Sequence, residues 1–288
     1  MKLKNLVLTS LAVAALVGCG GGGSPTPTGS ENNHETIDAH VSPVTSVVFK
    51  PVAVSSCDKS FALLMLGDYA LNSNPWGKDK ITDFTQCVSG ASVGTVLDNT
   101  AIQTGATAQF RWDWPSENSN ADIKAYPEIL YRPGGKGMTS IPFADVAGLS
   151  VTHDVTISAT GDYNVTYDIW VDSTATTDHW PHKAEIMIKL QQTWKDAPVI
   201  DTIAVDGNQF EVFEHTVINA SYNWKWKVLV FASKTPLLKA SIPLKPFIDY
   251  LVSKNHLLQT DYISTIEFGA ELKRGKGMAT INSYSVSR

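Results

Sequence analysis

Residues 184–191 read AEIMIKLQ, and residues 164–172 read NVTYDIWVD. Apolar and polar residues alternate along both segments, which is typical of a β-strand with one face against a core. Side chains two positions apart share a face, so Ile186 and Ile188 belong to the core face while Glu185 faces away from it. The two segments therefore predict strands that present acids and aromatic residues on a face that is not the core.

The same alternation recurs along much of the chain. Residues 264–271, STIEFGAE, place Glu267 and Glu271 opposite an apolar face. Strands are predicted at residues 61–71, 106–114, 151–159, 163–172, 184–191, 222–233, 262–271 and 279–286. Because three of these strands carry acids on the face away from the core, a curved sheet would gather those acids in a cleft.

A single helix is predicted among the strands. Residues 243–254, PLKPFIDYLVSK, carry apolar side chains at helical spacing, with a proline in the first turn. One helix among many strands predicts an all-β fold, a jelly-roll β-sandwich of two antiparallel sheets with a concave substrate cleft. We expect the helix to pack against one of the sheets.

The composition excludes several classes of protein. The chain has 288 residues, of which 43% are apolar, so it can bury a core and is not disordered throughout. Only 18% of residues are charged, the formal net charge is −5 and the basic residues are scattered, so no nucleic-acid partner is expected. His179 and His182 are three apart, but Pro181 breaks helical spacing and no acid completes a zinc set. We expect a surface loop there, no metal site and no cofactor.

The N-terminal residues predict export. MKLKN is basic, an apolar run follows, and residues 16–19, LVGC, resemble the lipobox of bacterial lipoproteins. The resemblance implies a signal peptide at residues 1–18 and a lipid on Cys19, with a conventional signal peptide as the alternative. A flexible linker rich in Gly, Ser and Pro follows over residues 19–40, and residues 41–288 form the folded domain. We expect a protein anchored by lipid to a bacterial membrane, at the outer membrane or the cell surface.

Six motifs follow one another in the order found in a known family. They are NPWG at residues 74–77, IKAYP at 123–127, YDIW at 167–170, EIMI at 185–188, FIDYL at 247–251, and FGAE at 268–271 with GKG at 275–277. Together they resemble glycoside hydrolase family 12, the endo-β-1,4-glucanases and xyloglucanases with a compact jelly roll. The resemblance extends from about residue 56 to the C-terminus.

The resemblance assigns catalytic roles residue by residue. Glu185 matches the family's nucleophile, Glu271 its acid/base, and Asp168 the acid that hydrogen-bonds the nucleophile. The family retains the anomeric configuration, which implies a separation of about 5–5.5 Å between the two catalytic carboxyl groups. An ionised Glu185 and a protonated Glu271 can coexist only if their surroundings differ.

Substrate-binding residues also follow from the resemblance. Asn74 and Trp76 match the donor side of the family's cleft, and Met187 matches a methionine beside the nucleophile. Trp170 is a further stacking candidate, whereas Trp112, Trp224 and Trp226 could equally be core residues. Lys189 stands where the family strand carries a tryptophan, which puts stacking on the acceptor side in doubt.

The three cysteines divide between two expected roles. The family often has a disulfide closing its N-terminal hairpin, which implies a bond between Cys57 and Cys87. Export favours its oxidation. Cys19 is left for lipid.

The expected activity is retaining, endo-acting hydrolysis of β-1,4-glucan chains of the cellulose, mixed-linkage or xyloglucan type. The partner is then a β-glucan polysaccharide, and a monomer is expected. The alternative is a catalytically silent carbohydrate-binding lipoprotein on the same fold, which would explain Lys189 as drift in an abandoned cleft.

Overall fold

A computed structural model describes residues 47–78, 81–115, 122–135, 139–175, 182–194, 198–219 and 224–288. The predicted signal peptide, Cys19 and the linker lie outside these residues. Residues 46–288 form one unit with its own core. Among the described residues, no helix is both long and apolar enough to cross a membrane.

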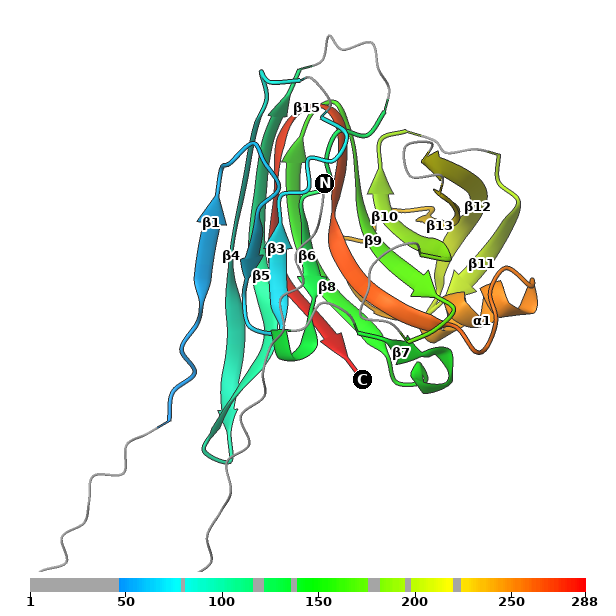
Figure 1. Cartoon of the computed structure of the whole chain (residues 1–288), viewed down its shortest axis with the longest axis horizontal. Coiled ribbons are helices and arrows are strands. Elements are labelled where there is room, and N and C mark those ends of the chain that lie inside the picture. The colour runs from blue at the N-terminus through cyan, green and yellow to red at the C-terminus, as the bar shows by residue number, and fades with distance from the viewer. Residues whose placement is uncertain are drawn as a thin grey trace, which may run out of the picture. The chain divides into compact units, whose positions relative to one another are not determined.

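The strands of this unit form two layers (Figure 1). The first layer contains β1 (Ala53–Ser56), β4 (Thr85–Leu97), β5 (Thr100–Trp114), β8 (Ser150–Ala159) and β14 (Lys239–Pro243). The second contains β2 (Leu63–Met65), β3 (Tyr69–Asn72), β6 (Glu128–Tyr131), β7 (Ile141–Pro142), β9 (Asp162–Asp172), β10 (Ala184–Gln192), β11 (Asp201–Val205), β12 (Asn208–Asn219) and β13 (Trp224–Ser233). Short 3₁₀ turns lie at Pro133–Gly135 and Phe143–Asp145. The pairings are antiparallel except that of β10 with β13, which is parallel. The predicted all-β jelly-roll fold is confirmed.

One long strand, β15 (Tyr262–Ser287), belongs to both layers. Its first part pairs with β9 and β6, and its second part pairs with β5 and β8. The prediction of two separate strands, 262–271 and 279–286, was therefore wrong. The register shifts between Leu272 and Arg274, and Gly275 adopts a φ of 95°, which only glycine reaches readily. The glycines between the two predicted strands mark a bend, because the chain continues to pair through them.

The opposite error occurred near the N-terminus of the domain. The strand predicted at residues 61–71 is a hairpin made of β2 and β3. Gly67 adopts a φ of 73°, and the N–H of Leu66 donates to the carbonyl of Tyr69 at 2.8 Å. Because the chain reverses at this glycine, the alternating residues belong to two paired strands instead of one continuous strand.

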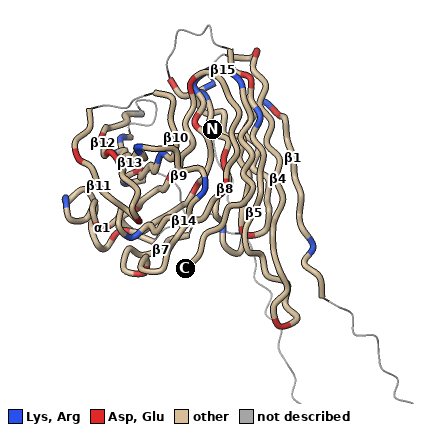
Figure 2. The backbone as a smooth tube through the Cα atoms, turned by 180° about the vertical axis from the view of Figure 1, so that it is seen from behind, with Lys and Arg blue, Asp and Glu red and all other residues tan. Residues whose placement is uncertain are grey.

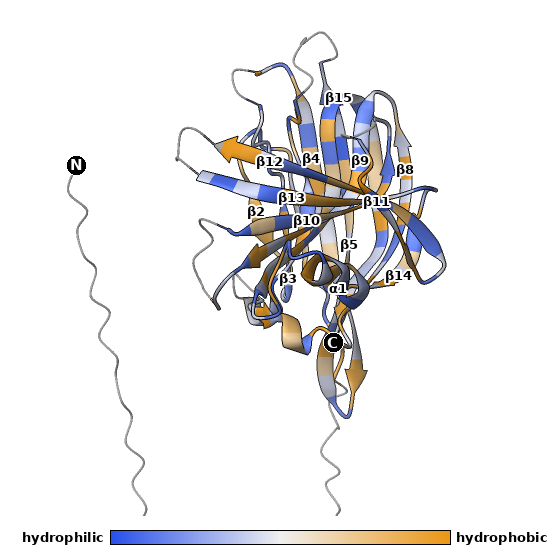
Figure 3. Cartoon of the chain, turned by 90° about the vertical axis from the view of Figure 1, so that its right-hand side faces the viewer, coloured by the Kyte–Doolittle hydropathy of each residue, from blue (hydrophilic) through white to orange (hydrophobic). Residues whose placement is uncertain are grey.

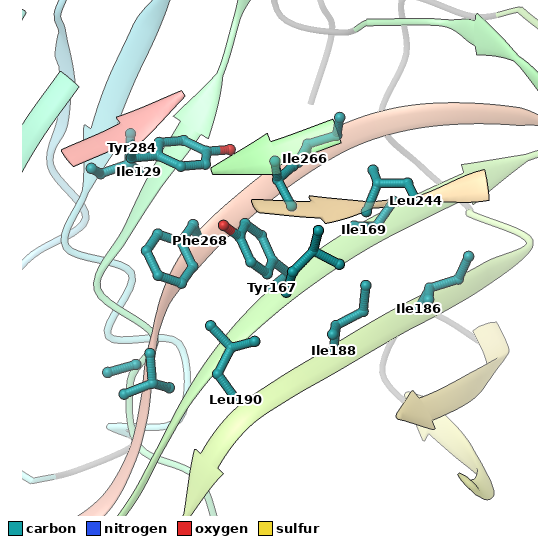
Figure 4. Close-up of a cluster of buried hydrophobic side chains, with 14 of the residues drawn as sticks. Ile129, Tyr167, Ile169, Ile186, Ile188, Leu190, Leu244, Ile266, Phe268 and Tyr284 are labelled. Carbon is teal, nitrogen blue, oxygen red and sulfur yellow. The ribbon is translucent and has the colours of Figure 1, made fainter. Parts of the chain in front are cut away.

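The core lies between the two layers. Tyr167 of β9 stacks on Phe268 of β15 with ring centroids 4.5 Å apart, and Phe268 lies 5.4 Å from Tyr284 in the other layer (Figure 4). Hydrophobic and hydrophilic residues alternate along β15 and its neighbours (Figure 3), as expected for strands with one face in this core. Trp112 is only 2% exposed and packs near Tyr163, so the core interpretation of this tryptophan is correct.

The predicted helix is α1 (Lys245–Ser253). Its Phe247 ring lies 5.1 Å from Phe210 of β12 and 4.9 Å from Phe231 of β13, both in edge-to-face geometry. The helix thus covers the core face of β12 and β13 and leaves their other face to line the region around Glu185.

The predicted disulfide is confirmed. Cys57 and Cys87 are bonded across a sequence separation of 30. The bond joins the segment before β2 to β4 and closes the hairpin that leads to Asn74. A loop of this length stabilises the fold by about 3–4 kcal/mol through chain entropy.

Candidate active site

Three neighbouring strands carry the predicted catalytic acids. Strand β9 lies between β10 and β15, and Asp168 is directly opposite Met187 on one side and Glu267 on the other. Glu185 is opposite Trp170, and Glu271 is opposite Asn164. Because each of these residues alternates with a core residue, all of the acids occupy the face of the sheet that points away from the core.

Five acids interact on this face, and we call them the carboxylate cluster. The cluster consists of Glu128, Asp168, Glu185, Glu267 and Glu271. Each is largely buried, and the charges of the other four all act to raise the pKa of Asp168. The structure therefore brings together the three acids that the sequence singled out and adds two more.

Glu185 has the most strongly organised carboxylate. Its Oε2 accepts a hydrogen bond of 2.6 Å from the indole N–H of Trp226, and Asp168 hydrogen-bonds the same carboxyl group. Burial raises the pKa of Glu185 to about 7, and the charges of Glu271 and Glu267 act in the same direction. The two hydrogen bonds act in the opposite direction because they stabilise the ionised form.

The surroundings of Asp168 favour its protonated form. Burial and the charge of Glu185 raise the pKa of Asp168 well above its usual range. Its Oδ1 atom is buried and receives no hydrogen bond from any residue that the structure describes. An ionised Asp168 would thus hold an uncompensated charge, whereas a protonated Asp168 can donate to ionised Glu185.

Asn164 orients the carboxyl group of Glu271. The Asn164 side-chain amide donates to Oε2 of Glu271, and the backbone N–H of Glu271 donates to Oδ1 of Asn164 at 3.2 Å. This reciprocal pair fixes Glu271 from the neighbouring strand. One oxygen of Glu271 thus accepts a bond from an amide, which is a different environment from that of Glu185.

Two of the quoted motifs hydrogen-bond to each other. The N–H of Gly77 donates to the carbonyl of Lys124, and the N–H of Tyr126 donates to the carbonyl of Asn74, both at 2.9 Å. A Cβ at Gly77 would lie 2.0 Å from the carbonyl oxygen of Ile123, so only glycine allows this contact. The contact holds the loop that carries Trp76, whose side chain is 54% exposed.

The same segment is tied to the strand of Glu271. Lys124 donates through its backbone to the carbonyl of Leu272 at 2.7 Å, and Leu272 donates back to Ala125 at 2.9 Å. The hydroxyl of Tyr126 reaches the carbonyl of Thr166 at 3.1 Å. The motifs at residues 74–77, 123–127 and 268–271 therefore meet at one place in the fold.

Known proteins resemble this chain in sequence and in structure. The model of glycosyl hydrolase family 12 matches residues 67–287. The chain belongs to this family. It is 33% identical over 229 residues to endoglucanase S of Pectobacterium parmentieri, covering 76% of this chain and 81% of that protein. It is 22% identical over 254 residues to an inactive glycoside hydrolase of Phytophthora nicotianae, covering 85% and 96%. The native family 12 xyloglucanase from Bacillus licheniformis has a similar structure, with a TM-score of 0.67, 26% identity and coverage of 81% and 99%.

As a member of family 12, the protein is a glycoside hydrolase. A patch of buried apolar side chains lies beside Glu185. Met187 is buried with Phe213, Val228, Val230 and Ala232, and Trp226 packs against this group. The patch lies on β10, β13 and β12, beside the carboxylate cluster. All five of these residues are at most 3% exposed, so the patch supports Trp226 and the strands beside the carboxylate cluster from within the fold.

Trp170 and Trp226 belong to an aromatic group. Trp170 stacks on the His182 ring at 4.7 Å and lies 5.8 Å from Trp226, and Trp224 stacks on Trp226 at 4.1 Å. His182 precedes β10 and belongs to no helix or strand, but the expected surface position was wrong, because its side chain is buried and its Nδ1 lies 2.9 Å from Asp172. The preceding residues 176–181, including His179, lie outside the described part of the chain.

Lys189 adjoins an aromatic ring that the sequence did not bring to notice. Its Nζ lies 5.6 Å from the centre of the Trp194 ring, and the Nζ of Lys273 lies 4.2 Å from the same ring. Elsewhere the Lys and Arg positions are spread over several elements (Figure 2). Position 189 thus carries a lysine where the family resemblance predicts a tryptophan, and the ring of Trp194, five residues later, lies beside that lysine.

Glu128 and Glu267 were not assigned a role from the sequence. Alternation places Glu267 on the face of Glu271, four residues earlier, which was a usable signal. Glu128 follows the IKAYP motif directly, but only the pairing of β6 with β15 brings it into the cluster. Within the described residues, no group of three or more His, Cys, Asp or Glu side chains is arranged to hold a metal ion.

Proposed function

We propose that this protein cuts β-1,4-glucan chains internally by double displacement, with Glu185 as nucleophile and Glu271 as acid/base. Endo-β-1,4-glucan hydrolysis is the activity that family 12 membership gives to the chain. The observation that carries the assignment of residues is the hydrogen-bonded Asp168–Glu185 pair within reach of the charge of Glu271.

In the first step, Glu185 attacks the anomeric carbon while Glu271 protonates the departing glycosidic oxygen. The bond between the carbon and that oxygen breaks, and an ester between the sugar and Glu185 forms. In the second step, ionised Glu271 takes a proton from water, the water oxygen attacks the same carbon, and Glu185 leaves as a carboxylate. Both proton transfers use Glu271, so the site returns to its starting state.

The surroundings of the two acids support different protonation states. Glu185 accepts hydrogen bonds from Trp226 and from protonated Asp168, and both stabilise the carboxylate that attacks. The hydrogen bond from Asp168 weakens when Glu185 becomes an ester and strengthens again when Glu185 leaves as a carboxylate. Asp168 is thus a positioning residue that acts through the nucleophile.

An activity panel tests the function and the substrate class. Purified residues 41–288 should release oligosaccharides from soluble carboxymethylcellulose, barley glucan or xyloglucan, with little release from xylan. Binding to these glucans without any release of reducing ends would favour the catalytically silent alternative, a state that one relative's name reports for that relative. The presence of Glu185, Asp168 and Glu271 in one cluster favours the enzyme.

We further propose that Cys19 carries lipid and anchors a monomeric enzyme to a bacterial membrane through residues 20–40. The support is the LVGC sequence at residues 16–19, which lies outside the described residues. Cys19→Ser should release the protein into the soluble fraction, and a variant that stays with the membrane would contradict the anchor. Sedimentation of residues 41–288 at one monomer mass would support the oligomeric state.

A further inference from the structure

Two acids of the carboxylate cluster have no part in the proposed reaction. Glu128 lies on β6 and is 1% exposed, while Glu267 lies on β15 and is 8% exposed, the same as Glu185. Glu267 is opposite Asp168 across one strand pairing, and Glu128 is opposite Gly269 across another. Both therefore occupy the face that carries the nucleophile.

The side chain of Glu128 is held by two amides. Its Oε1 accepts hydrogen bonds from the side chains of Asn72 at 2.8 Å and Asn74 at 3.1 Å. Its Oε2 is buried and accepts no hydrogen bond from the described residues, but the Glu128 carboxyl group hydrogen-bonds that of Glu267. Two buried carboxyl groups in contact are stable only when a proton lies between them.

We assign the proton of this pair to Glu128, because Glu128 is the more deeply buried of the two acids, 1% exposed against 8% for Glu267. Burial raises the pKa of Glu128 well above its usual range, and the charge of Glu267 and the hydrogen bond to it act in the same direction, whereas the amides of Asn72 and Asn74 act to lower it. Burial also raises the pKa of Glu267, but its hydrogen bonds to Glu128 and Thr265 act to lower it. Glu128 is therefore the donor and Glu267 the carboxylate that accepts.

Gly269 allows the two side chains to meet. A Cβ at this position would lie 2.2 Å from the carbonyl oxygen of Pro127 and 3.0 Å from the Cβ of Glu128. The backbone N–H of Ala270 donates to the same Pro127 carbonyl at 3.2 Å. The close approach of β6 to β15 at a glycine thus fixes Glu128 against Glu267 through the backbone.

Glu267 keeps a small exposed area beside its protein donors. An ionised carboxylate offers about four acceptor positions. Donors to Glu267 include the Thr265 hydroxyl at 3.0 Å, the Trp170 side chain and the acid of Glu128. Glu267 is as exposed as Glu185, which must touch the substrate, so a donor from the sugar can reach it.

We propose that Glu267 is a substrate-binding residue that accepts a hydrogen bond from a hydroxyl group of the glucan, on the side of the reaction centre where Asn74 lies. Glu128 is its positioning residue, since it holds the carboxylate in place with its own proton. This role rests on the proposed function, because the occupant of the site is the glucan chain that Glu185 and Glu271 cleave. A backbone glucose unit is common to all three candidate substrates, so the contact should serve each of them.

The test measures binding separately from catalysis. Calorimetry measures the Kd of cellotetraose for an inactive parent, Glu185→Gln. The same measurement is made on two double variants, which add Glu267→Gln or Asp249→Asn to the parent. Asp249 is on the exposed face of α1, so its substitution is the charge-matched control. A lost hydrogen bond to a charged group should weaken binding about 10- to 100-fold in the Glu267 variant and not in the control. A folded Glu267 variant whose Kd stays within about twofold of its parent overturns the proposal.

Two further measurements keep the result interpretable. Glu128→Gln can still donate to Glu267 and should weaken binding much less than Glu128→Leu, whereas equal effects would contradict the positioning role. If Glu267→Gln does not fold, Glu267→Asp withdraws the carboxylate by one methylene, and unchanged affinity in that variant overturns the contact. Hydrolysis of glucan by the unaltered protein is assayed on its own, and its absence would overturn the proposed function rather than the role of Glu267.

Discussion

Trp226 donates its indole N–H to Oε2 of Glu185 at 2.6 Å, across the parallel pairing of β13 with β10. The bond stabilises the ionised nucleophile in surroundings that otherwise favour the neutral acid, because burial raises the pKa of Glu185. An aromatic side chain therefore has an electrostatic task at this site in addition to any contact with the sugar.

Trp226→Phe removes this donor and keeps most of the ring. The pKa of Glu185 should rise by about one to two units, since a hydrogen bond to a charged group contributes about 1.5–3 kcal/mol. The acidic limb of the plot of kcat/KM against pH should shift to higher pH, so activity is lost mainly at low pH. A profile that keeps its acidic limb in the variant would contradict this role, and Trp112→Phe in the core serves as the matched control for ring substitution.

Glu185→Ala should lower kcat by about 10⁴-fold or more, because no other group can form the covalent intermediate. Glu271→Ala should cost about 10²- to 10⁴-fold, as expected for loss of general acid/base catalysis. A 2-fluoro glycoside should label Glu185 of the unaltered enzyme. Mass mapping of the label to any other residue would overturn the assignment of the nucleophile.

The alternation of residues predicted the strands that carry the catalytic acids, β9, β10 and the first part of β15, because one face of each lies against a continuous core. It did not single out β4 or β12, which are among the longest strands of the fold. Among the segments that it did name, it was wrong at two glycine-containing stretches. Gly67 reverses the chain between β2 and β3, whereas Gly275 only bends β15, which goes on pairing with other strands. At both places a glycine with a positive φ interrupts a run of alternating residues. The presence of partner strands decides the outcome, and that is a property of the whole fold.

Some features of the site could likewise be predicted from the sequence, and others depend on the whole fold. Alternation placed Glu185, Asp168 and Glu271 on the non-core face, and the family resemblance supplied their expected roles. The contact of Trp226 with Glu185 and that of Glu128 with Glu267 depend on which strands are neighbours and in what register. Neither can be read from residues that lie 41 and 139 positions apart in the chain.

The buried carboxyl groups should make stability depend on pH in a specific direction. Burial raises the pKa values of Glu128, Asp168, Glu185 and Glu267, so the folded state binds more protons than the unfolded state above their ordinary pKa values. The free energy of unfolding therefore falls as pH rises. For Glu185 alone the loss occurs between pH 4.5 and about 7 and is on the order of 3 kcal/mol.

The opposite behaviour is expected at lower pH. The hydrogen bond from Lys254 lowers the pKa of Asp201 to about 2, so the stability from this group is present above pH 4 and disappears below it. Thermal unfolding should show its highest midpoint in mildly acidic buffer. Glu185→Gln should make the decline toward pH 7 shallower, and an unchanged slope in this variant would contradict the raised pKa of Glu185.

Removal of the disulfide tests how the hairpin beside Asn74 is braced. Cys57→Ser together with Cys87→Ser should lower the free energy of unfolding by about 3–4 kcal/mol, because the 30-residue loop regains its freedom in the unfolded chain. Urea unfolding of the oxidised protein and the double variant measures the difference. Reduction of the unaltered protein should reproduce it, and a variant as stable as the parent would show that the bond contributes nothing to the fold.

Gly269→Ala links the backbone to the carboxylate cluster. The added Cβ would lie 2.2 Å from the carbonyl oxygen of Pro127 and 2.9 Å from the Cα of Glu128, so β6 must move away from β15. We expect a loss of about 1–3 kcal/mol in stability, as for other overpacked sites, and a weaker affinity for cellotetraose because Glu128 no longer holds Glu267. Gly148→Ala is the control, since its Cβ would meet only the Arg288 backbone at 3.4 Å. Equal unfolding midpoints for the two variants would show that this approach of strands is not needed for the fold.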